Sequence, residues 1–402
     1  LLVRLLQTTS DALKEQMLEF HCDSFSVPVE RLKSVFSPYR ICPLGAHVDH
    51  QLGMVSALAT EMGIWVHYSE RSDGQCVIRS EGFPGEVQFE LSSPPQRQFD
   101  WADYARGALQ ALQRRYTLTR GLSISINGEV SEVGLSSSAA IGLAYLVAFS
   151  GINDIDLNSK ELIELDREIE NEFLGLKNGL LDQSAIVLSE PGCLTVLDCG
   201  SGQADIHPIG ADFVFLAVFS GVRQPLVASQ QFNKRVDECL LAGAEIRSLV
   251  DGSQSLPVPV GVSEYSEFLQ VQPQLTSISR RRARHFYSEC ERVRKGRVAW
   301  QEGDAVGFGQ LMNASCESSI HQYQTGSAEM IALYEVLVQA PGVYGARFSG
   351  AGFRGCVVAL IDHQRRDQVL DSVSRHYGSL FPEHLAGLWA FETRAARGLT
   401  VR

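Results

Sequence analysis

Hydrophobic and polar positions along the chain repeat with two different periods, so the sequence predicts both strands and helices. Residues 122–126, Leu-Ser-Ile-Ser-Ile, alternate one by one, as in a strand with a buried face. Residues 160–173 carry an apolar stripe with helical spacing, formed by Leu162, Leu165, Ile169 and Phe173, and Asn158 or Ser159 can cap its start. By the same criteria we expect helices over 105–116, 228–250 and 280–298, and strands over 195–197, 213–218 and within 343–361. The predicted fold class is α+β.

Length and composition indicate a globular protein with more than one domain. The chain has 402 residues, of which 45% are hydrophobic, enough for a sizeable core. A polar connection near residues 200–210 separates two expected strands, and we place a boundary there, with lobes of residues 1–200 and 201–402. No apolar run approaches the about 18 residues of a membrane span. The apolar residues 1–7 run into a charged stretch, which is not typical of a signal peptide.

The charge distribution argues against two classes of partner. A net charge of −12 disfavours binding to nucleic acid and to anionic membranes. One basic cluster departs from this trend, and we interpret it as a solvated helix face; it comprises Arg280, Arg281, Arg282, Arg284, Arg292, Arg294, Lys295 and Arg297. The nine cysteines show no C-x-x-C pair and no metal-binding spacing. This pattern is typical of reduced thiols, so we expect a cytoplasmic location.

The segment 134–140, Gly-Leu-Ser-Ser-Ser-Ala-Ala, has the features of an anion site. It lies between the strand expected at 122–126 and an apolar helical run. Small residues at a helix start leave backbone N–H groups and the positive end of the helix dipole open to a phosphate. The segment is neither a Walker loop nor a G-x-S-x-G nucleophile turn, because neither motif occurs in the chain. A serine-rich cap without a ligand is the alternative.

Two further segments carry candidate chemistry. Residues 40–53 read Arg-Ile-Cys-Pro-Leu-Gly-Ala-His-Val-Asp-His-Gln-Leu-Gly, and residues 349–356 read Ser-Gly-Ala-Gly-Phe-Arg-Gly-Cys. The second contains G-x-G-x-x-G, but the apolar run after it reads as a strand, which argues against a dinucleotide site and favours a tight glycine turn. The His and Asp residues of the first segment could suggest a metal site, but no further Cys, His or Glu nearby completes a ligand set. Recognition of hydroxyl groups and a purely structural turn are the two interpretations that remain.

Taken together and in this order, the three segments resemble the three motifs of the GHMP small-molecule kinases, and residues 40–53 resemble the galactokinase signature in particular. Further matches fall at residues 101–104, 179–183, 282–285 and 342–345. The resemblance extends from about residue 35 to residue 395. It implies a two-lobed fold with mixed sheets and helices, in which the cleft between the lobes binds a sugar and Mg²⁺-ATP.

The resemblance also implies roles for individual residues. Asp182 and Arg40 match the residues that act on the attacking hydroxyl, and Ser138 and Glu170 match the Mg²⁺ ligands. ATP is expected to bind to Gly134, Leu135, Ser136, Ser137, Ser138 and Ala139. The sugar is expected to contact Ala46, His47, Asp49, Gly179 and Gly352. The expected reaction is transfer of phosphate from ATP to the anomeric hydroxyl of a sugar.

Ala46 is the departure from the family pattern that bears most on the substrate. Galactokinases usually have a glutamate there, close to the 6-hydroxyl of the sugar. Two carboxylates about 4 Å apart repel each other by about 1 kcal/mol in water and about 4 kcal/mol at an effective dielectric constant near 20. Loss of the protein carboxylate therefore favours a sugar acid. We expect D-galacturonic acid, and a pentose such as L-arabinose, which has no C6 group, is the competing interpretation.

Other departures and two other functions remain open at this stage. Glu132 and Arg354 replace glycines usual in the second and third motifs. A galactokinase-like sugar sensor without catalysis is the main alternative function, although known sensors lose residues of the 134–140 segment. An isoprenoid or homoserine kinase is disfavoured by the Gly-Ala-His-Val-Asp-His stretch. The oligomeric state cannot be read from the sequence.

Overall fold

Two β-sheets organise the molecule. The computed structural model describes residues 3–7, 11–128, 134–222, 225–252 and 256–402, and Glu132 lies outside them. Within these residues, an eight-stranded sheet contains β2 (Lys33–Ile41), β3 (Met54–Arg71), β4 (Gln75–Ser80), β5 (Glu86–Glu90), β6 (Gly121–Gly128), β7 (Cys193–Asp198), β8 (Gln203–Pro208) and β13 (Thr400–Val401). A five-stranded sheet contains β1 (Arg4–Leu5), β9 (Val214–Phe219), β10 (Val343–Phe348), β11 (Cys356–Ile361) and β12 (Trp389–Thr393).

The long strand β3 is the spine of the larger sheet. Its residues 58–68 pair with β2, residues 64–71 pair with β6, and the first four residues pair with β7. The register between β2 and β3 shifts between Pro38 and Arg40, next to the close approach of Gly63, whose added Cβ would lie 2.4 Å from the Ser37 carbonyl oxygen. Such an irregularity bends a strand and re-aims its side chains. Here it lies directly before Arg40, one of the predicted site residues.

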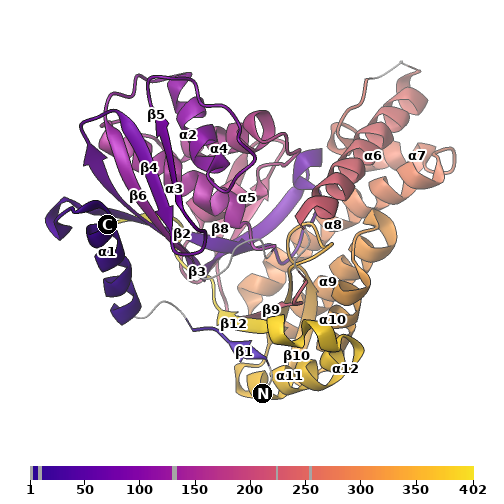
Figure 1. Cartoon of the computed structure of the whole chain (residues 1–402). Helices are drawn as coiled ribbons and strands as arrows, with labels where there is room; N and C mark the ends of the chain where they lie inside the picture. Colours follow the sequence, from indigo (N-terminus) through magenta and orange to yellow (C-terminus); the bar gives the residue numbers. More distant parts are fainter. Residues whose placement is uncertain (1–2, 8–10, 129–133, 223–224, 253–255) are drawn as a thin grey trace.

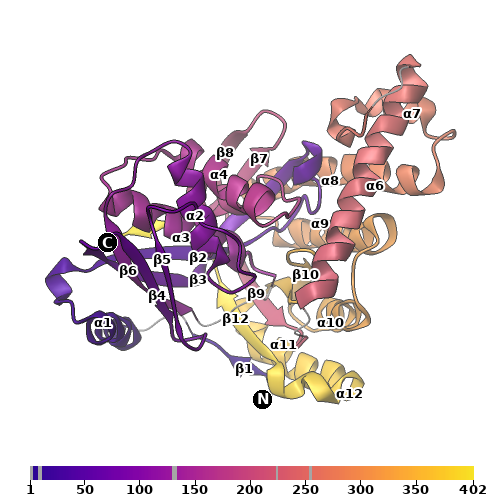
Figure 2. The ribbon, with the colours of Figure 1, turned by 45° about the horizontal axis from the view of Figure 1, so that its top comes forward.

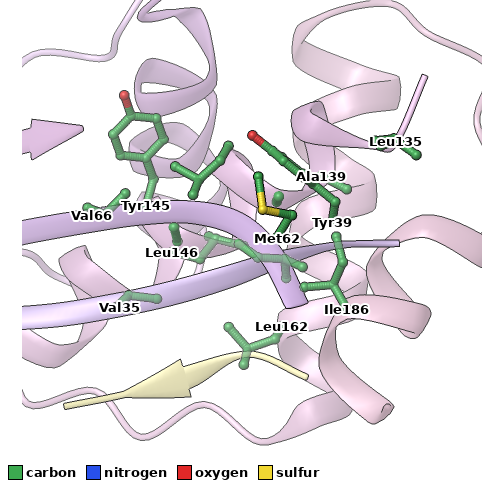
Figure 3. Packing of buried hydrophobic residues seen from close by; sticks show 14 of the residues in the cluster. Val35, Tyr39, Met62, Val66, Leu135, Ala139, Tyr145, Leu146, Leu162 and Ile186 are labelled. Carbon is green, nitrogen blue, oxygen red and sulfur yellow. The ribbon is translucent and has the colours of Figure 1, made fainter. Parts of the chain in front are cut away.

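Helices cover one face of the larger sheet, as Figure 1 shows. They are α2 (Asp103–Gln113), α3 (Ser137–Ile152), α4 (Ser159–Glu168) and α5 (Leu181–Leu188). Helix α3 is apolar on all sides and almost wholly buried, as expected for a helix enclosed between a sheet and other helices. Figure 3 shows Ala139, Tyr145 and Leu146 of this helix packed near Val35, Tyr39 and Val66 of the strands.

Helix α1 (Asp11–Phe25) contacts β3 and β6 of the same sheet. The alternation in β6 has a structural reason: Leu122 and Ile124 belong to the main core, whereas Ser125 hydrogen-bonds to His21 of α1. The polar side of β6 is therefore also buried, and not solvated as an amphipathic strand would be.

The second half of the chain surrounds the smaller sheet. The helices are α6 (Pro225–Asp251), α7 (Tyr265–Val271), α8 (Ser277–Glu302), α9 (Ala305–Ser318), α10 (Ala328–Gln339), α11 (Arg366–Ser372) and α12 (Gly378–Leu380). Figure 2 shows α6 and α7 projecting to one side of this half. Helix α9 packs closely on β10: a Cβ added to Gly345 would lie only 1.9 Å from the Gly309 carbonyl oxygen. Only a pair of glycines permits this approach.

The two ends of the chain cross between the sheets. Strand β1 pairs in parallel with β12, and thus joins the sheet formed by the second half of the chain. Strand β13 pairs with β2, so the last residues return to the sheet formed by the first half. No helix among the described residues is long and apolar enough to cross a membrane.

The expected helices and strands are present, with one change of helix type and two corrections. The connection expected at 200–210 contains strand β8, which pairs with β7. The segment expected as one helix at 160–173 is α4, with the predicted Asn158 cap, followed by a π-helical turn at Ile169–Phe173. The basic cluster of α8 is only partly a solvated face: Arg284, Arg294, Lys295 and Arg297 are exposed, but Arg282 is fully buried and pairs with Glu238. The interpretation as a solvated face was wrong for Arg282, because Glu238 of α6, which is distant in the sequence, neutralises its charge. All nine cysteines are free thiols.

Acid should weaken the attachment of α1. The His21 ring is fully buried, with Ser125 and Ser69 as hydrogen-bond partners, and burial lowers its pKa to about 4. Because this pKa lies below the usual 6.5, the unfolded chain takes up a proton first as the pH falls, and stability present above pH 6.5 is lost toward pH 4. We expect a loss of about 2 kcal/mol between pH 7 and pH 5 from this residue. Urea unfolding of wild type and His21→Gln measures it, and equal losses in both would exclude His21 as the group.

Candidate active site

A cavity of about 870 Å³ brings together the predicted residues from distant parts of the chain. Its wall includes Arg40, Ala46, His47, Asp49, Gly134, Ser136, Ser137, Ser138, Gly179 and Asp182. Residues of the second half, among them Phe232, Arg347, Gly350 and Arg354, complete it. Leu135, Ala139, Glu170 and Gly352 do not line this cavity. Leu135 and Ala139 belong to the core, and Gly352 packs against Thr325 and Phe348.

Arg40, Asp182 and Ser136 form a compact polar cluster at the cavity wall. The Arg40 guanidinium donates through Nε to Asp182 Oδ1 at 2.8 Å, and Nη2 lies 2.7 Å from the same oxygen. The Ser136 hydroxyl donates to Asp182 Oδ2 at 2.5 Å. Arg40 is 4% exposed, whereas the Asp182 side chain is 19% exposed. The carboxylate is therefore held in one orientation by a buried cation and remains accessible from the cavity.

The predicted anion site is built by two glycine-containing loops in contact. Helix α3 begins at Ser137, and Gly134 and Ser136 before it have φ of 76° and 59°. An added Cβ on Gly134 would lie 2.9 Å from the Ser349 carbonyl oxygen, and one on Gly350 would lie 2.8 Å from the Gly134 carbonyl oxygen. The strand expected to follow 349–355 is β11, so the dinucleotide interpretation lacks its helix. The N-terminal turn of the 16-residue helix α3 thus faces the cavity beside Asp182.

Glu170 is a buried carboxylate whose surroundings suit a bound cation. It is fully buried in the π-helical turn, and Asn178 Nδ2 donates to its Oε2 at 2.8 Å. Burial, together with the charge of Asp182, raises the pKa of Glu170 to about 7, although Asn178 and the nearby Ser138 hydroxyl act in the other direction. Its Oε1 has no hydrogen-bond partner among the described residues. An unpaired buried oxygen of this kind is costly unless a cation or a proton binds it.

The few protein oxygens near Glu170 suit Mg²⁺ better than a metal ion that is held by protein ligands alone. Among the described residues, no group of three or more His, Cys, Asp or Glu side chains could hold a metal. Mg²⁺ commonly takes one or two protein oxygens and completes its shell with phosphate and water. Glu170 and Ser138 can supply those oxygens. By the same finding, His47, Asp49 and His50 do not form a group that could hold a metal ion.

His47 and Asp49 are held rigidly in the loop after β2. His47 has a φ of 60°, its ring stacks on Tyr323 at 4.4 Å between centroids, and its Nε2 donates to the Gly350 carbonyl oxygen at 3.1 Å. Burial lowers the pKa of His47 well below its ordinary value, so the ring is neutral, and its single proton is on Nε2. The other ring nitrogen, Nδ1, is therefore an acceptor, and it has no partner among the described residues. Gly179 passes close to Asp49, since an added Cβ would lie 2.4 Å from Asp49 Oδ2.

The sequence did not predict the buried network that holds Ala46. Glu289 of α8 is fully buried, and its Oε2 accepts hydrogen bonds from the backbone N–H groups of Gly45 at 2.9 Å and Ala46 at 3.2 Å. His285 Nε2 donates to the Ala46 carbonyl oxygen at 2.9 Å. The family match at residues 282–285 was the one available signal. Glu289 lies one helical turn after His285, within the cluster interpreted as solvated.

Comparison with known proteins agrees with this geometry. Residues 103–190 match the GHMP kinases N terminal domain, and residues 297–379 match the GHMP kinases C terminal domain. Over 375 residues the chain is 40% identical to the galacturonokinase of Arabidopsis thaliana, and the match covers 88% of each protein. The chain belongs to the GHMP kinases.

Within this family the similarity is to the galactokinase branch. The chain is 30% identical to the galactokinase of Staphylococcus carnosus, over 86% of this chain and 89% of that protein. The structure of Lactococcus lactis galactokinase in complex with galactose superposes with a TM-score of 0.88 at 26% identity, covering 96% of this chain and 99% of that one. Methanococcus jannaschii mevalonate kinase, at 16% identity and a TM-score of 0.63, shares the fold alone. This GHMP kinase is thus a sugar kinase with ATP as a substrate.

Proposed function

We propose that this kinase transfers the γ-phosphoryl group of ATP to the anomeric C1 hydroxyl of D-galacturonic acid, giving D-galacturonate 1-phosphate and ADP. The observation that carries the proposal is a single cavity lined by the Arg40–Asp182 pair, by the N-terminus of α3 and by the uncharged Ala46. The similarity to the Arabidopsis galacturonokinase supports the same acceptor. In this proposal the lobes are residues 1–200 and 201–402, and the acceptor and ATP bind between them.

Asp182 and Arg40 act on the acceptor oxygen in this mechanism. Asp182 accepts the proton of the C1 hydroxyl as that oxygen forms its bond to the γ-phosphorus, while the bond from the γ-phosphorus to the β-phosphate oxygen breaks and ADP leaves. Arg40 holds the carboxylate in place and offsets the negative charge that develops on the transferred group. His47 and Asp49 hydrogen-bond to the sugar hydroxyls, and this positioning contributes much of the rate. Gly179 permits a close approach to Asp49, and Gly352 permits the close packing of its own loop on Thr325 and Phe348.

The nucleotide is bound by residues 134–139 at the start of α3. Backbone N–H groups there, together with the helix dipole, favour the phosphates. Ser138 and Glu170 hold Mg²⁺, which neutralises phosphate charge when bound. We further propose a cytoplasmic protein with a sugar acid and ATP as its partners and with neither nucleic acid nor membrane; the free thiols and the net charge of −12 support this.

The acceptor is tested by coupled ADP release with Mg²⁺-ATP and four sugars: D-galacturonate, D-glucuronate, D-galactose and L-arabinose. We expect the highest kcat/KM with D-galacturonate. Highest turnover with D-galactose or L-arabinose would refute the acid acceptor and retain the kinase. Saturable sugar binding without ADP release for any of them would point to a sensor.

An Ala46→Glu variant tests the charge argument. We expect it to lower kcat/KM for D-galacturonate about 100-fold, within the range of about 1 to 4 kcal/mol for two carboxylates about 4 Å apart. Ala46→Gln is the matched control, since it adds nearly the same volume without charge. If both variants lose the same activity, the effect is steric, and Ala46 does not select against charge.

A further inference from the structure

Arg347 is a buried cation in the wall of the cavity. It lies next to the end of β10, is 1% exposed and borders the same cavity as Ala46 and Asp182. Its Nε donates to the Phe348 carbonyl oxygen at 2.8 Å, and its Nη1 donates to the Ser315 hydroxyl at 2.6 Å. In the part of the chain that the structure describes, its Nη2 donates to no residue and no carboxylate forms an ion pair with it. A buried charge ordinarily has a paired counter-charge.

The acid in this network is already occupied. Glu289 Oε1 accepts from Arg292 Nε at 2.6 Å, and its Oε2 accepts from Ser315 at 2.9 Å and from the backbone of Gly45 and Ala46. Ser315 thus stands between Glu289 and Arg347. Glu289 forms its ion pair with Arg292 and stabilises the loop at Ala46. Its link to Arg347 runs through the Ser315 hydroxyl and is not an ion pair.

The same contacts place Arg347 near the side of the cavity formed by Ala46. Three hydrogen bonds in series, of 2.6, 2.9 and 3.2 Å, lead from Arg347 Nη1 through Ser315 and Glu289 to the Ala46 amide. The Ala46 methyl group adds neither a charge nor a hydrogen-bonding atom. The other two arginines of the wall differ: Arg40 pairs with Asp182, and Arg354 is in the 349–356 loop at intermediate exposure.

We propose that Arg347 forms the carboxylate subsite of this kinase, in which its guanidinium binds the C6 carboxylate of the sugar acid. The inference rests on the proposed function. A guanidinium offers paired N–H groups in a plane that matches a carboxylate, and burial strengthens such a bond. Arg347 supplies the attraction for the acid, and Ala46 removes the repulsion. Specificity for a sugar acid then has both an attractive and a permissive element.

The test compares two acceptors that differ only in charge at C6, D-galacturonate and D-galacturonamide. Wild type should prefer the acid. In Arg347→Gln, kcat/KM for the acid should fall about 100-fold, with a much smaller fall for the amide, so that the preference is lost. Arg347→Lys, which keeps the charge, should recover part of the preference. Arg354→Gln is the matched control, since it removes a positive charge from the same cavity wall, and it should keep the preference.

The outcomes separate this inference from the proposed function. If wild type phosphorylates D-galacturonate and Arg347→Gln retains the preference for the acid, or if both acceptors are affected equally, Arg347 has only a structural role. If Arg354→Gln loses the preference instead, the subsite is misplaced. Failure of wild type to phosphorylate D-galacturonate refutes the proposed function itself. Should Arg347→Gln not fold, the Arg347→Lys variant and the wild-type acid-to-amide ratio decide, because a ratio near one overturns the subsite.

Discussion

Replacement of Asp182 by asparagine should lower kcat for sugar phosphorylation about 1,000-fold, the range expected when a positioned general base is lost. Asparagine has the same shape and can still accept a hydrogen bond from Arg40, but it cannot take up the proton of the acceptor hydroxyl. The KM values for ATP and for the sugar should change little, since the phosphates and the sugar hydroxyls are bound by other residues. Coupled ADP release and single-turnover measurements give kcat and the two KM values.

Stability must be measured on the same Asp182→Asn variant, because Arg40 is 4% exposed and loses its counter-charge. Thermal unfolding separates lost chemistry from lost folding. The matched control is Asp205→Asn, which changes an exposed carboxylate on β8. A folded Asp182→Asn protein that keeps a tenth or more of wild-type turnover contradicts the role of Asp182 as the base.

The second large effect is expected on stability. Gly345→Ala should destabilise the fold by about 3 kcal/mol or more, because overpacking of this severity forces the backbone to move. The added methyl group would lie 1.9 Å from the Gly309 carbonyl oxygen, and backbone atoms cannot yield as a side-chain end can. Urea unfolding measures the change.

A matched glycine separates this contact from the general effect of adding a methyl group. Gly82→Ala is suitable, since the nearest atom to its added Cβ is Ser80 Oγ at 3.8 Å, and it should remain within about 1 kcal/mol of wild type. Similar losses in both variants would mean that the close packing of α9 on β10 is not the cause. Since β10 also carries Arg347, we expect surviving Gly345→Ala protein to bind the sugar acid less well.

Local patterns were enough to predict the elements around residues 134–140 and Glu170. The alternation at 122–126 is β6, the apolar run after 134–140 is α3, and the stripe at 160–173 is α4 with its π-helical turn. These are short-range features, set by side-chain period and by capping. The π-helical turn that buries Glu170 could not be predicted from these local patterns, because a regular helical stripe does not show where one extra residue is inserted.

Contacts between distant segments could not be predicted in the same way. Arg40 and Asp182 are 142 positions apart, and Arg347 reaches Ala46 only through Ser315 and Glu289. A charged residue on a helix reads as solvated unless its partner is known, which is why Glu289 and Arg282 were missed as buried groups. The family resemblance supplied Arg40 and Asp182, but it gave no sign of the buried Arg347 in the cavity wall.

The crossed chain ends tie the two halves of the chain together. The backbone N–H groups of Arg4 and Leu6 donate to the carbonyl oxygens of Leu388, just before β12, and of Ala390 within it. At the other end, the backbone of Arg402 exchanges two hydrogen bonds with that of Ser34 in the larger sheet. Each half of the chain is thus fastened to the other half's sheet by a terminal strap. A wide separation of the two halves would first have to break one of these strand pairings.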